Sequence, residues 1–139
     1  MSRPFVHHLR VRYHECDAQK VVFNSRYGEY VDIACGEYLR SLGYYDGGPN
    51  GNPELQLVRQ VTEWKSPARF DDELEIAVAP IKLGNSSLTL RTEIRRKGEA
   101  LLLAHTETTY VHVDPATWTS SPIPPALRAA LSSSPSSSS

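Results

Sequence analysis

The sequence predicts one α+β domain in which an antiparallel sheet of five strands covers a single long helix. Its length of 139 residues fits one domain. Apolar residues recur at helical spacing over residues 26–42, whereas most of the remaining chain alternates with a period of two. The strand-like segments of the second half follow one another through short turns, so neighbouring strands should pair antiparallel, and the helix needs a sheet to cover its one apolar stripe.

The first strand is predicted over residues 5–13, "FVHHLRVRY", which mixes apolar and basic residues. Leu9, Val11 and Tyr13 end it in near-alternation, a pattern typical of a half-buried strand. Asp17 then precedes a short apolar run, residues 21–23, that stops at Asn24. An acidic residue just ahead of a helix start is a candidate functional group.

The helix is predicted over residues 26–42, about 17 residues or roughly 25 Å long. Its apolar positions share one face: Tyr27, Tyr30, Val31, Ala34, Cys35, Tyr38, Leu39 and Leu42. The side chain of Asn24 or Ser25 is expected to cap its start, and Gly43 to end it. Ile33, on the otherwise polar face, suggests a further contact there.

Four more strands are predicted over residues 57–66, 73–83, 86–97 and 100–113. The segments "PARFDD", "GN" and "KGE" separate them as turns. A short helix is expected after the prolines that follow Asp114. The domain is assigned to residues 1–131, and the Ser-rich tail, residues 132–139, is predicted to be disordered.

Composition excludes several classes of protein. With 15 Lys and Arg against 16 Asp and Glu, the chain lacks the basic field that drives nucleic-acid binding. No segment approaches the roughly 20 apolar residues of a membrane span, and the start has no signal-peptide core, so we expect a soluble cytoplasmic protein. The two cysteines, Cys16 and Cys35, are expected to be reduced thiols.

A set of separated motifs resembles one enzyme family. The residues Arg10-Val11, Cys16-Asp17, 21–24 and Tyr27 look like the active-site signature of the 4-hydroxybenzoyl-CoA thioesterase family of hotdog-fold enzymes. The later segments "SPARFDDELEI" and "PIPPALRAAL" resemble the bacterial acyl-CoA thioesterases of that family. The resemblance implies the hotdog fold, dimers whose sheets join edge to edge, active sites at the dimer interface, and no cofactor or metal.

The resemblance also implies two catalytic groups. Asp17 aligns with the family's nucleophile or general base, and the backbone N–H of Asn24 with its oxyanion donor. The chemistry agrees, because a helix start offers unpaired N–H donors and the positive end of the dipole to a carbonyl oxygen that gains negative charge. Nucleophile and base remain open for Asp17.

Six further residues are substrate-binding candidates, each with a simpler alternative. Lys20 replaces the family's usual Gly or Asn; it could contact a CoA phosphate or be a solvated lysine, and a positive φ there would cost about 1 kcal/mol and could re-bend the loop. Phe23 and Tyr27 come from the signature; Tyr27 is most simply a core residue of the helix and could also shape the acyl pocket. Asp32 could line the acyl pocket or simply favour the first helical turns electrostatically.

Glu63 lies near a position that is often acidic in the bacterial branch, but an exposed strand carboxylate explains it as well. Ser86 matches a serine near bound pantetheine in the family, or is an ordinary turn residue. The basic run of residues 95–97 could hold nucleotide phosphates, although basic residues are common at strand ends. Cys16 could be a nucleophile with His14 as base, but a small packed side chain is simpler.

A metal site is not expected, because the five histidines match no zinc spacing. The predicted function is therefore hydrolysis of an acyl-CoA thioester to a carboxylic acid and free CoA by a homodimer or homotetramer. The alternatives are an acyl-carrier-protein thioesterase, with that protein as partner, and a non-catalytic module that binds acyl-CoA. A hotdog dehydratase is less favoured, since no His and acidic residue pair at the helix start.

Overall fold

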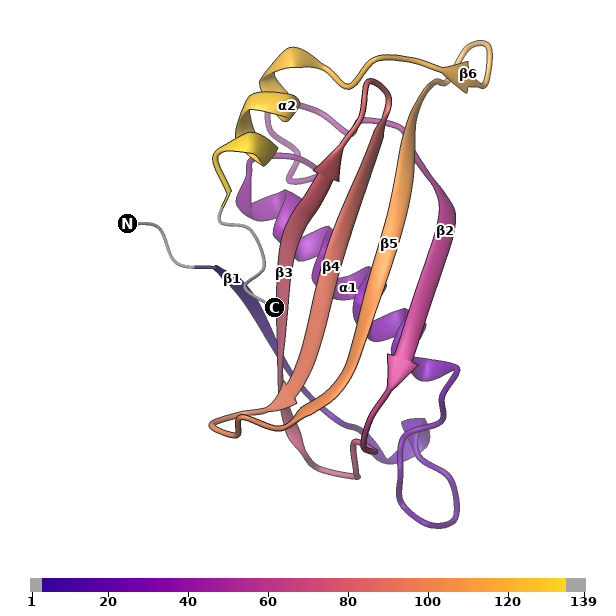
Figure 1. The fold of residues 1–139 in the computed structure, drawn as a ribbon, viewed down its shortest axis with the longest axis vertical. Coiled ribbons are helices and arrows are strands. Elements are labelled where there is room, and N and C mark those ends of the chain that lie inside the picture. The colour runs from indigo at the N-terminus through magenta and orange to yellow at the C-terminus, as the bar shows by residue number, and fades with distance from the viewer. Residues whose placement is uncertain (1–3, 135–139) are drawn as a thin grey trace.

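The structure is a computed structural model and describes residues 4–134. Figure 1 shows one sheet with the long helix α1 across its far face. The elements in chain order are β1 (Phe5–Arg10), the 3₁₀ turn η1 (Tyr13–Glu15), α1 (Arg26–Ser41), β2 (Leu55–Trp64), β3 (Glu73–Leu83), β4 (Ser87–Arg96), β5 (Leu102–Asp114), β6 (Thr119–Ser120) and α2 (Pro125–Ser132).

The long strands form an antiparallel sheet in the order β1-β3-β4-β5-β2, so β1 and β2 are its edges. This confirms the predicted α+β hotdog fold, with the sheet around one helix. The two-residue strand β6, which pairs with the end of β5, is an addition that the sequence pattern did not indicate. The short helix after the prolines is confirmed as α2.

α1 buries the predicted stripe against the sheet. Its buried residues are Tyr27, Tyr30, Val31, Ala34, Cys35, Tyr38 and Leu39. Gly43 ends it as predicted, with φ of 95°. The N–H of Gly43 donates to the carbonyl of Arg40 and that of Tyr44 to the carbonyl of Leu39, which together form a Schellman motif.

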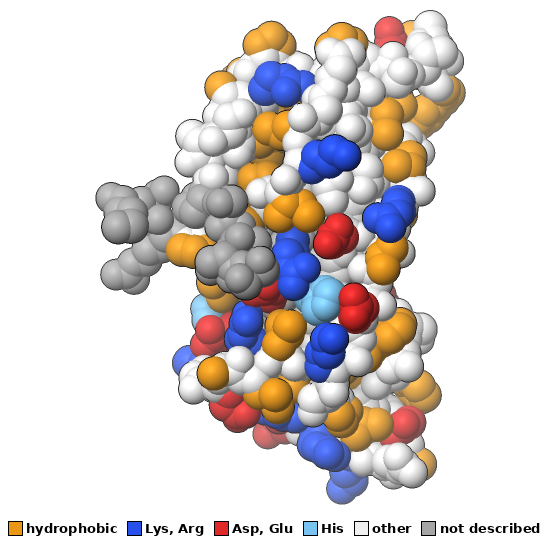
Figure 2. Space-filling model, viewed as in Figure 1, with side chains coloured by type: hydrophobic (Ala, Val, Ile, Leu, Met, Phe, Trp, Pro, Cys, Tyr) orange, Lys and Arg blue, Asp and Glu red, His pale blue; other side chains and the backbone are white. Residues whose placement is uncertain are grey.

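The two faces of the sheet differ in chemistry. Leu88, Leu90 and Ile94 of β4 are buried on the face toward α1. The intervening Arg91, Glu93 and Arg95 lie on the outer face, because successive strand side chains point in opposite directions. Figure 2 views this outer face and shows basic and acidic side chains interspersed with apolar ones.

Two local predictions were wrong. The first strand ends at Arg10 rather than Tyr13, because the Glu15 carboxylate accepts the N–H of Arg12 at 2.8 Å and folds residues 13–15 into η1. The start of α1 has no side-chain cap: Ser25 itself has helical φ and ψ, so its side chain does not reach back to the first N–H groups.

The C-terminal part of the described residues lies against α1. α2 reaches Ser132, and the Tyr38 hydroxyl contacts the Ser134 hydroxyl at 2.7 Å. The last five residues of the predicted disordered tail lie outside the described residues. No helix within residues 4–134 is long and apolar enough to cross a membrane.

Candidate active site

Asp17 opens a tight hairpin. Its N–H donates to the carbonyl of Val21 at 2.9 Å, and its own carbonyl accepts the N–H of Lys20 at 2.9 Å. Lys20 has φ of 63°. This is the geometry of a three-residue hairpin with a left-handed closing residue, the position where Gly or Asn is favoured. The lysine is accommodated at a cost of about 1 kcal/mol, and the hairpin keeps its regular form.

The two oxygens of the Asp17 carboxylate have different surroundings. Oδ1 accepts the N–H of Gln19 at 2.8 Å and lies 3.4 Å from the N–H donor of Val21. Among residues 4–134, no donor lies within hydrogen-bond distance of Oδ2, and no Lys or Arg pairs with the half-buried carboxylate. One oxygen therefore holds the turn while the other is available for chemistry.

The start of α1 carries free backbone donors. The N–H groups of Arg26 and Tyr27 donate to the carbonyls of Phe23 and Asn24, at 2.9 and 3.2 Å. Over the described part of the chain, the N–H groups of Asn24 and Ser25 donate to no protein acceptor. They lie at the positive end of the helix dipole and can stabilise an oxygen that becomes negative.

Backbone contacts hold the hairpin beside the helix start. Cys16 and Val22 form a β-bridge, and the N–H of Phe23 donates to the carbonyl of Glu15 at 3.1 Å. On the other side, the N–H of Val22 donates to the carbonyl of Ala68 at 2.9 Å. Asp17 and Asn24 thus belong to one short, braced segment, at the lower end of the molecule in Figure 1.

Tyr27 borders this region and is also a core residue. It is only 1% exposed, and its hydroxyl accepts the N–H of Ala68 at 3.0 Å. Burial raises the pKa of its phenol, so it stays neutral. Its ring meets that of Trp64 edge to face, with centroids 6.3 Å apart. Phe23, by contrast, is 44% exposed beside the helix start.

Asp32 lies at a cavity of about 310 Å³ between α1 and the start of β2. Burial raises the pKa of its carboxyl group, while a hydrogen bond from Gln60 opposes that change. The remaining lining is mostly apolar and includes Leu39, Leu55, Leu57 and Tyr110. The structure thus brings a predicted substrate-binding residue to a cavity on the helix that carries Asn24 at its start.

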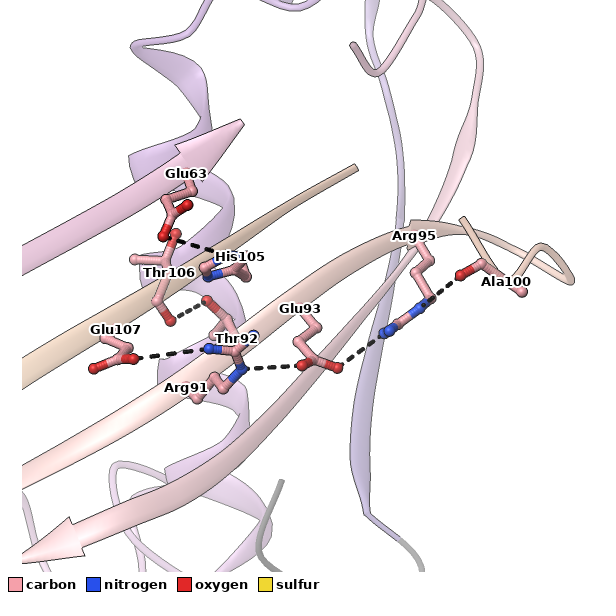
Figure 3. A network of polar contacts seen from close by, with 9 residues as sticks. All are labelled: Glu63, Arg91, Thr92, Glu93, Arg95, Ala100, His105, Thr106 and Glu107. Atoms are coloured by element: carbon pink, nitrogen blue, oxygen red, sulfur yellow. Dashed lines mark hydrogen bonds and ion pairs between the residues drawn. The ribbon is translucent and has the colours of Figure 1, made fainter. Parts of the chain in front are cut away.

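Glu63 and Ser86 do not meet Asp17 within one chain. Glu63 points away from α1 to the outer face, where it approaches His105 at 3.7 Å (Figure 3). Ser86 lies in the β3–β4 turn at the upper end of Figure 1, and its carbonyl accepts the N–H of His112. The length of β4 separates that turn from the hairpin of Asp17, about 30 Å at roughly 3.3 Å per residue.

The other candidates have structural roles. The basic residues 95–97 are each paired: Arg95 with Glu93, Arg96 with Asp72, and Lys97 with Glu73. Burial raises the pKa of the Cys16 thiol, and the nearby carboxylates of Glu15, Asp17 and Asp72 raise it further. The thiol therefore stays protonated, as expected of a small packed side chain rather than a nucleophile. In the described part of the chain, no group of three His, Cys, Asp or Glu residues could hold a metal ion.

Sequence reasoning missed the supporting role of Glu15. Its carboxylate accepts the Tyr30 hydroxyl at 2.9 Å as well as the N–H of Arg12. A glutamate two residues before an aspartate carries no recognisable signal, since its partner on α1 is 15 residues away in the sequence. Gly36 was also missed, because the cavity that it borders is formed with residues of β2 and β5, which lie far from it in the sequence.

A carboxylate with one free oxygen, braced beside a helix start with free N–H donors, is suited to transferring an acyl group to water. The fold is that of the hotdog thioesterases. Comparison with known proteins agrees: the family model of the thioesterase-like superfamily matches residues 11–131. The chain belongs to this superfamily and is a thioester hydrolase.

Individual relatives are similar over most of their length. A putative esterase of Aquifex aeolicus is 31% identical over 105 residues, which cover 75% of this chain and 82% of the relative. The acyl-CoA thioester hydrolase YbgC of Escherichia coli O6:H1 is 32% identical over 108 residues, covering 77% and 80%. Among solved structures, the gentisyl-coenzyme A thioesterase BH1999 is 25% identical, with a TM-score of 0.79 over 91% of this chain and 99% of its own.

Proposed function

We propose that the protein hydrolyses an acyl-CoA thioester to a carboxylic acid and free CoA, with Asp17 and the N–H of Asn24 as its catalytic groups. The observation that carries the proposal is the free Oδ2 of Asp17 on a hairpin that is braced against the uncapped start of α1. The names of two relatives, an acyl-CoA thioester hydrolase and a gentisyl-CoA thioesterase, support CoA as the thiol of the substrate.

In the nucleophilic route, Oδ2 of Asp17 attacks the thioester carbon, and the carbonyl oxygen takes up negative charge beside the N–H of Asn24. The C–S bond then breaks, and CoA leaves as a thiolate that takes a proton from water. Water hydrolyses the resulting mixed anhydride and restores the Asp17 carboxylate. In the general-base route, Asp17 instead removes a proton from water, the hydroxide adds to the carbonyl carbon, and the proton passes to the departing thiolate.

The remaining candidates have graded support as substrate contacts. Phe23 and Lys20 are exposed next to the catalytic groups, and no ion pair engages Lys20 among residues 4–134, so its ammonium group is free for a CoA phosphate. Tyr27 shapes the wall from within the core, and Asp32 borders the cavity. Ser86 requires a second chain to take part, and Glu63 points to the outer face of the sheet, away from α1.

A homodimer through the edge strand β2 supplies that second chain. β2 exposes four large apolar side chains, Leu57, Val58, Val61 and Trp64, each between 43% and 57% exposed. The other edge, β1, exposes His8 and Arg10, side chains of the kind that protect an edge from pairing. Antiparallel pairing of two β2 strands would bring the β3–β4 turn that contains the partner's Ser86 toward the start of α1. A homotetramer would add a contact at Ile33, which is 49% exposed.

A panel of CoA thioesters with short aliphatic, long-chain and aromatic acyl groups tests the proposal. A thiol-reactive dye should report release of CoA from at least one of them. Tight binding without thiol release across the panel would contradict the proposal and favour a non-catalytic acyl-CoA-binding module. Release only from acyl-carrier-protein thioesters would move the substrate to that protein partner.

A further inference from the structure

Gly36 lies in the third turn of α1, where a glycine is unfavourable. A glycine in a helix interior destabilises the helix relative to alanine. Neither crowding nor backbone conformation explains this glycine. Within residues 4–134, and apart from its chain neighbours and the backbone of its own helix, no atom lies within 4 Å of the place where its Cβ would be, and its φ is not in the positive range. Its missing side chain instead leaves space that belongs to the cavity between α1 and β2.

We propose that this cavity receives the hydrocarbon part of the acyl group and that Gly36 determines the longest chain that it accepts. The inference rests on the proposed function and adds the substrate class, a thioester of a medium to long unbranched acyl chain. The volume of about 310 Å³ lies at the lower end of the range for small-molecule sites, about 300–1,000 Å³.

The inner lining of the cavity suits a hydrocarbon. Leu39, Leu55 and Leu57 contribute apolar surface, and Tyr110 adds a phenol. Burial raises the pKa of the Tyr110 phenol and that of the Cys35 thiol behind it, to about 12 for the thiol, so both are neutral near pH 7. Among the described residues, Asp32 is the one acidic group of the lining, and the other lining side chains carry no charge that opposes the entry of a methylene chain.

The cavity is also in line with the catalytic groups. Gly28, Asp32 and Gly36 follow one another at intervals of four residues, so they share one face of α1. That face looks toward β2, because a Cβ on Gly28 would lie 3.6 Å from the Gln60 side-chain oxygen. An acyl chain whose carbonyl lies at Asn24 would run along this face, past the Gln60 side chain, to reach the cavity.

Helix geometry sets the expected chain length. At 1.5 Å per residue, Asp32 lies about 12 Å and Gly36 about 18 Å beyond Asn24 along the axis. An extended chain advances roughly 1.2 Å per bond, since three backbone bonds span about 3.6 Å. About ten carbons are needed to reach Asp32 and about 15 to reach Gly36. Octanoyl groups should end before the cavity, and palmitoyl groups should reach Gly36.

The test compares kcat/KM of wild type and Gly36→Leu on butyryl-, octanoyl-, lauroyl- and palmitoyl-CoA. The leucine fills the open space, so palmitoyl-CoA should lose about tenfold or more while butyryl- and octanoyl-CoA stay within about twofold. Gly36→Ala should raise the melting temperature with a smaller loss on palmitoyl-CoA. Glu37→Leu adds the same side chain at the neighbouring position of α1 and should leave the profile unchanged.

Binding of non-hydrolysable S-alkyl-CoA thioethers provides a readout that does not need turnover. Gly36→Leu should weaken binding of the hexadecyl thioether about tenfold and leave that of the butyl thioether unchanged. Equal losses for long and short chains, or no loss for either, would overturn the assignment of the cavity. A wild-type protein that binds the thioethers in this pattern but hydrolyses no thioester would instead disprove only the proposed hydrolysis.

Discussion

The hydroxyl group of Tyr30 donates a hydrogen bond of 2.9 Å to Oε1 of Glu15, and this contact ties α1 to the segment that carries Asp17. Burial raises the pKa of the Tyr30 phenol, and the hydrogen bond to Glu15 and the negative charge of Glu15 raise it further. The proton therefore stays on the tyrosine. The contact joins two elements whose relative position determines the distance from the carboxylate to the helix start.

Removing that hydroxyl should affect turnover more than stability. Tyr30→Phe should lower the free energy of unfolding by about 1 kcal/mol, as loss of one hydrogen bond usually does, and lower kcat because η1 is less firmly held. Tyr38→Phe is the matched control, since it deletes another buried α1 phenol whose hydroxyl contacts Ser134 at 2.7 Å. Urea denaturation and kcat measurements check both; equal kcat values in the two variants would contradict the positioning role.

Asp17→Asn should retain the fold and ligand affinity and lower kcat by about 10² or more, because the amide is nearly isosteric but neither attacks a carbonyl nor accepts a proton readily. Asp46→Asn is the control: Asp46 also accepts a backbone N–H within its own loop, that of Gly48 at 2.8 Å. Steady-state kinetics check the pair. Near-wild-type turnover by Asp17→Asn would refute the catalytic assignment.

Lys20→Gly should stabilise the protein by up to about 1 kcal/mol, because glycine adopts the positive φ of this position without a steric penalty. Ala18→Gly, in the same hairpin, lacks this benefit and should be neutral or destabilising. Thermal unfolding measures both. KM for the thioester should rise in Lys20→Gly if the ammonium group contacts a CoA phosphate and stay constant if the lysine is only solvated.

Val58→Lys should convert the proposed dimer to monomer and reduce turnover, because a charge replaces a 57%-exposed apolar side chain on the β2 edge. Ile81→Lys places the same charge on β3, at an exposed site away from that edge, and should leave assembly unchanged. Sedimentation at micromolar concentration distinguishes them. A fully active wild-type monomer would exclude the shared site, and dissociation of a tetramer to dimers by Ile33→Lys would indicate a helix-face contact.

On the outer face of the sheet, Glu93 forms ion pairs with Arg91 and Arg95 (Figure 3). These pairs should make the stability of the protein depend on pH. Burial alone would raise the pKa of Glu93, but hydrogen bonds from Arg91 and Arg95 lower it below its ordinary value. A lowered folded-state pKa stabilises the protein above the unfolded value, about 4.3, and this contribution is lost as pH falls through the folded value. Glu93→Gln should therefore be less stable than wild type at pH 7, with a difference that shrinks below about pH 4.

The fold was predictable because its signals are local. Residues 73–83 alternate so regularly that the predicted strand has the observed bounds of β3, and Gly43 ends α1 where its positive φ is needed. The end of β1 could not be predicted, since it depends on one side chain, Glu15, turning back to an N–H group. The absent cap at Ser25 depends on backbone angles that residue type alone does not determine.

The site was predictable only in part. The resemblance indicated Asp17 and Asn24, and the structure describes their surroundings. The cavity at Gly36 depends on residues from α1, β2 and β5 that are up to 78 positions apart, from Asp32 to Tyr110, so no local pattern reveals it. The segment around Glu63 alternates with the period of two that is typical of a strand, but this alternation does not show which face of the sheet points toward the helix.

The anchoring of Oδ1 makes the two oxygens of Asp17 inequivalent, and an isotope experiment can detect this. In the nucleophilic route only Oδ2 enters the anhydride, and where water attacks the aspartyl carbon rather than the acyl carbon, its oxygen replaces that same atom. The hydrogen bond from the N–H of Gln19 to Oδ1 hinders the rotation of the carboxylate that would exchange its two oxygens between catalytic cycles. After many turnovers in ¹⁸O-labelled water, the Asp17 peptide should therefore accumulate one heavy atom rather than two, and the general-base route should leave it unlabelled.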